Sequence, residues 1–96
     1  EKIGLSSYDR ILNYPNPFRG TTTVVYQLDE PVDNAFIQVY ALNGSLVDVV
    51  EGLGTQAGEN RFVYSTRLTG GTYIYRLVTQ KQGVTTYSKS NTFMIK

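Results

Sequence analysis

The chain has 96 residues, of which 41% are hydrophobic and 18% are charged, and its formal net charge is +1. This composition is typical of one globular domain with a single core and excludes a disordered chain. The nine Lys and Arg residues are scattered along the sequence, which excludes the clustered basic surface that nucleic-acid binding requires. The sequence contains no apolar run of about 18 residues, so it has no candidate membrane span.

The first residues are expected to lie outside the main domain. Residues 1–8 are weakly patterned and are predicted to be a linker remnant or an edge strand, whereas residues 9–96 are predicted to form a single domain. The sequence starts with neither Met nor a signal peptide. We therefore interpret it as a module of a longer protein, with any export signal lying upstream.

The domain is predicted to open with a short strand over residues 9–14. This strand must end at Pro15, Asn16 and Pro17, because proline fixes φ and lacks an N–H donor. The chain then bends, and Phe18 is predicted to tuck under the sheet that follows.

Alternation of apolar and polar residues predicts strands through the middle of the chain. Residues 21–28 and 35–41 alternate cleanly. Asn43 and Gly44 predict a hairpin turn, because both residues tolerate positive φ, and residues 46–50 form its return strand.

The second half continues in the same way after a loop at residues 52–58 that is predicted to be flexible. Further strands are expected over residues 59–64, 71–79, 84–90 and 92–96. The absence of any helical period predicts an all-β fold, an immunoglobulin-like antiparallel sandwich of about seven strands. Its core is predicted to contain Val24, Tyr26, Ile37, Val39, Phe62, Tyr73, Tyr75 and Leu77, and the opposite face of residues 21–28 to carry Thr23, Val25 and Gln27.

Residues 68–77 are similar to the tyrosine corner of such sandwiches. Gly71 marks a turn, Tyr73 is placed to hydrogen-bond back across the corner, and Tyr75 follows at the buried position. This pattern supports the sandwich and predicts no chemistry.

The sequence lacks the residues that most catalysis requires. It contains no His and no Cys, which removes the commonest general base, the thiolate nucleophile and a Ser-His-Asp arrangement. The acidic residues fall in turns and at strand ends, so no carboxylate pair is expected to face a cleft. We predict that the domain is not an enzyme and uses no cofactor.

Two other kinds of site were considered. The segment 29–34 could offer oxygen ligands to Ca²⁺, but its spacing lacks the alternation of a calcium loop, and a solvated connection is favoured. Tyr40 and Tyr87 are predicted to be exposed and could stack on a sugar, although two scattered rings are ordinary for a sandwich.

An ordered series of short motifs runs through nearly the whole chain. It begins with Asn-Tyr-Pro-Asn-Pro-Phe at residues 13–18 and continues through Val-Tyr-Ala-Leu-Asn-Gly at residues 39–44. It goes on through the corner at residues 68–77 and closes with Phe-Met-Ile-Lys at residues 93–96. This series resembles the C-terminal sorting domain, type A, of the type IX (Por) secretion system. Its Pro-Asn-Pro opening is shared with the immunoglobulin-like domain of flagellar-hook capping proteins.

The resemblance implies an exported protein of the Bacteroidetes type, secreted or held at the cell surface, with a covalently linked cargo upstream. It implies three partners: the outer-membrane translocon, its shuttle protein and a sortase-like surface protease. Recognition through an exposed strand edge or the terminal hairpin would need no pocket. The alternatives that stay open are a structural immunoglobulin-like accessory module of a secreted hydrolase or flagellar cap, and a carbohydrate-binding module.

Two sets of residues follow from this interpretation. The segment that the machinery reads is predicted to comprise Thr92, Phe93, Met94, Ile95 and Lys96, with Lys89 adding positive charge. The residues predicted to hold the motif in shape are Pro15, Asn16, Pro17, Gly44, Gly71 and Tyr73.

Overall fold

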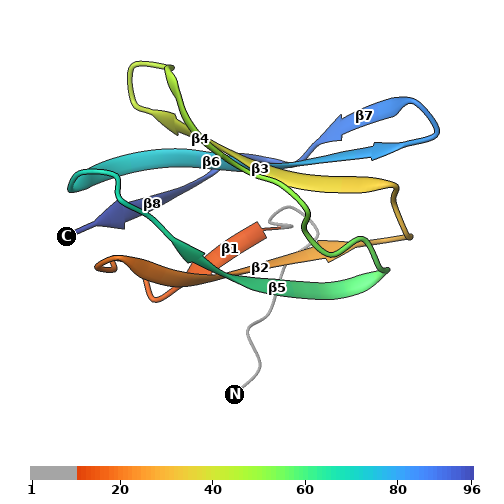
Figure 1. Ribbon diagram of the computed structural model, residues 1–96, viewed down its shortest axis with the longest axis horizontal. Helices are drawn as coiled ribbons and strands as arrows, with labels where there is room; N and C mark the ends of the chain where they lie inside the picture. The colour runs from red at the N-terminus through yellow and green to blue at the C-terminus, as the bar shows by residue number, and fades with distance from the viewer. Residues whose placement is uncertain (1–10) are drawn as a thin grey trace.

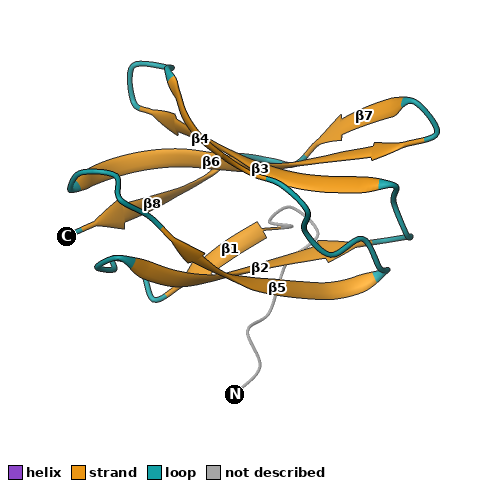
Figure 2. Cartoon of the chain, viewed as in Figure 1, coloured by secondary structure: helices purple, strands orange, loops and turns teal. Residues whose placement is uncertain are grey.

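The computed structural model describes residues 11–96, in which the chain forms eight β-strands and no helix (Figures 1 and 2). The predicted linker or edge strand at residues 1–8 lies outside the described residues. The strands are β1 (Ile11–Tyr14), β2 (Thr21–Leu28), β3 (Asn34–Ala41), β4 (Leu46–Val50), β5 (Gly58–Ser65), β6 (Gly71–Lys81), β7 (Val84–Tyr87) and β8 (Asn91–Ile95).

The strands form two facing sheets, which confirms the predicted all-β sandwich (Figure 1). One sheet has the order β1-β2-β5, and the other has the order β4-β3-β6-β7 with β8 also paired to β6. All these pairs are antiparallel. The eight strands correspond to the eight ranges expected from the sequence, one more than the predicted total of about seven. The long strand β6 has two partners on one side, β8 along Gly71–Tyr75 and β7 along Val78–Lys81.

The core lies between the sheets, as the alternation predicted. Seven of the eight predicted core residues are buried, and Phe62 alone is half-buried. Phe62 lies on β5, the edge strand of its sheet, and packs edge-on against Tyr26 at 6.4 Å between ring centroids.

Phe93 on β8 is the centre of an aromatic cluster. Its ring lies 5.2–5.8 Å, centroid to centroid, from the rings of Phe18, Tyr64, Tyr73 and Tyr75. These separations are in the favourable range for tilted aromatic pairs. Phe18 is 2% exposed, so it lies under the sheet as predicted.

Burial on the outer faces differs from the prediction. Val25 was placed on the outward face of β2 but is fully buried, because β2 is a central strand and Val25 lies directly between Leu12 and Arg61 of the neighbouring strands. Val78 on β6 is buried in the same way between Phe36 and Tyr87.

The predicted hairpin at Asn43 and Gly44 is present, but its turn differs from the expected one. Gly44 has φ +91°, whereas Asn43 does not take positive φ. The Gly44 N–H donates to the Ala41 carbonyl and the Ala41 N–H to the Ser45 carbonyl, both at 2.9 Å. This is a three-residue loop in which glycine alone occupies the left-handed position.

The loop at residues 52–58 is tied to the core, although it was predicted to be flexible. Leu53 packs against the core, and the Tyr26 hydroxyl donates to the Gly54 carbonyl at 2.5 Å. A Cβ on Gly54 would lie 2.5 Å from Oδ1 of Asn60. A larger residue at position 54 would therefore require the Asn60 side chain to move.

The tyrosine corner has the predicted geometry. The Tyr73 hydroxyl donates to the Thr69 carbonyl at 2.7 Å, and Tyr75 is fully buried two residues later.

We expect Tyr73→Phe to lower the free energy of unfolding by about 0.5–1.5 kcal/mol, the usual contribution of one such hydrogen bond. Chemical denaturation measures this. Tyr87→Phe is the control, because that hydroxyl forms no hydrogen bond within residues 11–96, and an equal loss in both variants would contradict the corner's role.

Buried tyrosines predict that stability falls at high pH. Burial raises the pKa of Tyr26 from 10.0 to about 12, and it raises the pKa values of Tyr64 and Tyr75 further. The raised pKa means that the unfolded chain loses these protons first, so stability is fully present below about pH 10 and declines above it. Denaturation midpoints should therefore drop between about pH 10 and pH 12. Tyr26→Phe should make the drop smaller, and an unchanged drop would refute the assignment.

Candidate functional site

The closing strand β8 divides its residues between the core and the surface. Phe93 and Ile95 are 2% and 6% exposed and point into the sandwich. Thr92, Met94 and Lys96 alternate with them and are exposed. Of the five residues predicted to form the recognition segment, three are therefore available at the surface and two hold the strand in the core.

The outer edge of β8 is covered by the Pro-Asn-Pro-Phe segment. The Asn16 side chain accepts from the Met94 N–H at 2.9 Å and donates to the Thr92 carbonyl at 3.1 Å. The Phe18 N–H then donates to the Met94 carbonyl at 3.0 Å, and the Lys96 N–H donates to the Phe18 carbonyl at 2.9 Å.

These four bonds correct the expectation of an exposed edge at the terminal strand. An edge strand offers its free N–H and C=O groups to an added strand, but on β8 those groups already have partners. Proline has no N–H, so this segment bonds β8 through the amide of Asn16 and the backbone of Phe18. Both prolines follow cis peptide bonds.

A buried polar network anchors the same segment from inside. The Tyr75 hydroxyl donates to Oδ1 of Asn13 at 2.8 Å, and the Asn13 amide donates to Oγ1 of Thr22 at 3.2 Å. The Thr22 hydroxyl donates in turn to the Pro15 carbonyl at 2.8 Å. Asn13 and Thr22 were not predicted as important residues. Asn13 was noted only as the first residue of the motif at residues 13–18, and a further signal for both is that each is polar at an inward position of a strand.

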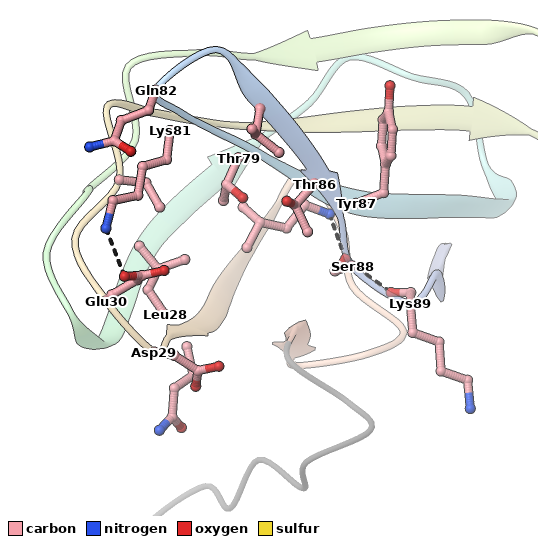
Figure 3. Close-up of a pocket in the computed structure, with 14 residues that line it drawn as sticks. Leu28, Asp29, Glu30, Thr79, Lys81, Gln82, Thr86, Tyr87, Ser88 and Lys89 are labelled. Carbon is pink, nitrogen blue, oxygen red and sulfur yellow. Dashed lines mark hydrogen bonds and ion pairs between the residues drawn. The ribbon is translucent and has the colours of Figure 1, made fainter.

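Lys89 does not join Lys96. The two residues lie beyond opposite ends of β8, roughly 20 Å apart at the rise of an extended strand. Lys89 instead lines an open groove of about 840 Å³ between the β6–β7 hairpin and the segment after β2 (Figure 3). The groove holds charges of both signs, including the ion pair of Lys81 with Glu30 at 2.7 Å.

The acidic segment 29–34 uses its oxygens within the protein. Glu30 pairs with Lys81, and Oδ2 of Asp33 accepts from the Gln82 N–H at 2.8 Å. Within residues 11–96, no three acidic, His or Cys side chains gather as a metal site. The same residues contain no helix long and apolar enough to cross a bilayer.

The structure brings Tyr40 and Tyr87 to one face of the larger sheet, with an arginine between them. The Arg76 guanidinium carbon lies 5.5 Å from the Tyr40 ring centroid and 4.2 Å from that of Tyr87. Because a cation lies against both rings, they do not form the continuous aromatic surface that sugar stacking was expected to use.

Comparisons with known proteins were made by sequence and by structure. Residues 13–90 match the family model described as the secretion system C-terminal sorting domain, so β8 follows the matched residues. Among solved structures, the chain is similar to the crystal structure of dimeric latent PorU from Porphyromonas gingivalis, with a TM-score of 0.75 and 19% identity. The similarity covers 88% of this chain but 9% of that chain, and it shows the fold alone. A search of curated protein sequences finds no match.

The Asn16 contact with β8 predicts a local effect of substitution. Asn16→Ala removes two hydrogen bonds and should lower the free energy of unfolding by roughly 1–2 kcal/mol. It should also speed amide hydrogen exchange at Met94. Asn16→Asp is the matched control, because it keeps the acceptor for the Met94 N–H and should preserve that protection. Exchange at Met94 that does not change in Asn16→Ala would show that this side chain does not hold the strand.

Proposed function

The chain belongs to the family of secretion system C-terminal sorting domains, and we propose that it performs this sorting as a folded, non-catalytic module. The family marks proteins that the type IX system exports to the cell surface or the extracellular space. The observation that carries the conclusion is the match over residues 13–90, which includes six of the eight strands of the sandwich wholly and half of β1.

The composition supports a module without chemistry of its own. The sequence has no His and no Cys, so the usual general bases and thiolate nucleophiles are missing. Among the described carboxylates, Glu30 and Glu59 form ion pairs and Asp48 accepts from the Tyr64 hydroxyl. Any activity of the parent protein then belongs to the cargo that we expect upstream.

We place the recognition surface on the exposed residues of β8. Thr92 and Met94 are exposed on β8, Lys96 is exposed directly after it, and Met94 is a hydrophobic residue left 47% exposed. Because the backbone edge of β8 is already bonded, the machinery would contact these side chains rather than add a strand. Lys89, beyond the other end of β8, supplies a separate positive charge.

The partners follow the order of export. The translocon in the outer membrane and its shuttle protein would bind the folded sandwich, and a sortase-like surface protease would then remove it from the cargo. What supports this order is the family match, together with a fold that presents side chains on a rigid strand and needs no pocket.

An export assay tests the proposal without removing the strand. Deleting residues 92–96 would also empty the core of Phe93 and Ile95, so a loss of export would be ambiguous. We therefore expect Met94→Glu combined with Lys96→Glu to leave the fold intact and to trap a periplasm-targeted fluorescent fusion of residues 1–96 inside a type IX-secreting bacterium. The unaltered fusion should reach the surface or the medium.

The control is Val63→Glu, which places a negative charge on an exposed apolar residue of the other sheet; Val63 is 68% exposed, against 47% for Met94. Thermal denaturation shows that each variant is folded. Equal export of the β8 variant and the control would remove β8 from recognition. Periplasmic retention of the unaltered fusion would refute the sorting proposal.

A further inference from the structure

We propose that the outer face of the larger sheet carries a binding site for a carboxylate of an acidic protein segment, centred on Arg76. The site lies on β3, β6 and β7, on the face turned away from the other sheet. In Figure 1 the hairpins that contain β4 and β7 both bend away from the sandwich on this side, so the face lies between them. This proposal goes beyond sorting and does not depend on it.

A closed set of hydrogen bonds fixes the guanidinium. Arg76 Nε donates to Oε1 of Gln38 at 2.9 Å, and Nη2 donates to the Tyr40 hydroxyl at 3.2 Å. The Tyr40 hydroxyl in turn donates to the same Gln38 oxygen at 2.9 Å. Each of the three side chains therefore orients the other two. The ring of Tyr87 packs against the guanidinium and restricts it further.

The guanidinium keeps donors that the protein does not use. An arginine has five N–H groups, and the two bonds above use one on Nε and one on Nη2. Within residues 11–96 no other acceptor bonds Arg76. The unused donors include those on the end formed by the two Nη atoms, where parallel N–H groups match the two oxygens of a carboxylate.

The positive charge has no counterpart in the described chain. Arg76 forms no ion pair within residues 11–96, where the ion pairs present join Arg61 to Glu59 and Lys81 to Glu30. The strand pairing places Gln38 directly opposite Arg76, and it places Thr92 opposite Ile74, two residues along β6; none of these three residues carries a charge. Arg76 is half-buried and Tyr87 is 54% exposed, so the site is open to a partner.

The chemistry favours a carboxylate over a phosphate. One planar cation with a single free end suits a singly charged, two-oxygen acceptor, whereas a phosphate at neutral pH carries nearly twice that charge. Within residues 11–96, no second cation bonds the same group of side chains. An acidic polypeptide segment supplies such carboxylates together with apolar groups for the neighbouring Ile74 and Tyr87.

The test is a titration of the purified 96-residue chain with a tetraglutamate peptide, followed by NMR. Saturable binding should shift the Nε–Hε signal of Arg76 and the side-chain amide of Gln38. We expect Arg76→Gln and Arg76→Lys each to weaken binding by about tenfold. Glutamine removes the charge, and lysine keeps the charge but lacks the two parallel N–H groups that bind both oxygens of a carboxylate. Arg67→Gln, which removes the same charge from an exposed loop position, should change the affinity by less than about twofold.

Gln38→Leu is the second variant, and it tests whether binding depends on the orientation of the Arg76 guanidinium as well as on its charge. It leaves Arg76 in place but removes the oxygen that orients it, so binding should weaken while the thermal midpoint shows that the domain is folded. Equal weakening in Arg67→Gln would reduce the effect to net charge and overturn the site. Tighter binding of inorganic phosphate than of the peptide would replace the carboxylate by a phosphate ligand. Absence of saturable binding would leave Arg76 as a cross-strand contact only.

Discussion

The packing of Phe93 against four other aromatic rings is the interaction on which the rest of the structure depends. Phe93 lies on the last strand, whereas Phe18 follows the first strand and Tyr73 belongs to the corner. One ring thus joins the beginning, the middle and the end of the domain. Emptying a large aromatic site in a core costs about 3–5 kcal/mol, a large share of the 5–15 kcal/mol that keeps a domain folded.

The aromatic cluster gives stability, and the polar network beside it gives the strands a unique register. Asn13, Thr22 and Tyr75 bury polar atoms, which is costly unless each finds a partner. Their hydrogen bonds are made only when β1, β2 and β6 are correctly aligned across the two sheets. A shifted strand would leave these atoms unpaired inside the core, so the network selects against misaligned pairings.

The features that the sequence predicted are those with local causes. Alternation in β2, β3 and β6 identified the buried rows, and the glycine and tyrosine spacing identified the corner. The features that it missed are set by pairing across long sequence distances. The alternation in β2 predicts that Val25 faces outward, and only its two neighbouring strands explain why it is buried. The sequence likewise predicts an exposed ring at Tyr40, whereas Arg76, 36 residues later, contacts it in the structure. The Asn16 contact with β8 spans 76 and 78 residues, and no local pattern indicates it.

That last contact has a consequence for when the domain can fold during synthesis. The Pro-Asn-Pro-Phe segment and the Phe93 ring meet only after almost the whole domain has been made, so until then the core of the early strands is incomplete. Long-range pairing of this kind makes folding slow. A chain cut short before Phe93 would lack the ring that closes the sandwich, and its bonding partners for Asn16 would be absent too. Folding of this domain therefore requires that the polypeptide has been translated through β8, which separates these molecules from those cut short before it.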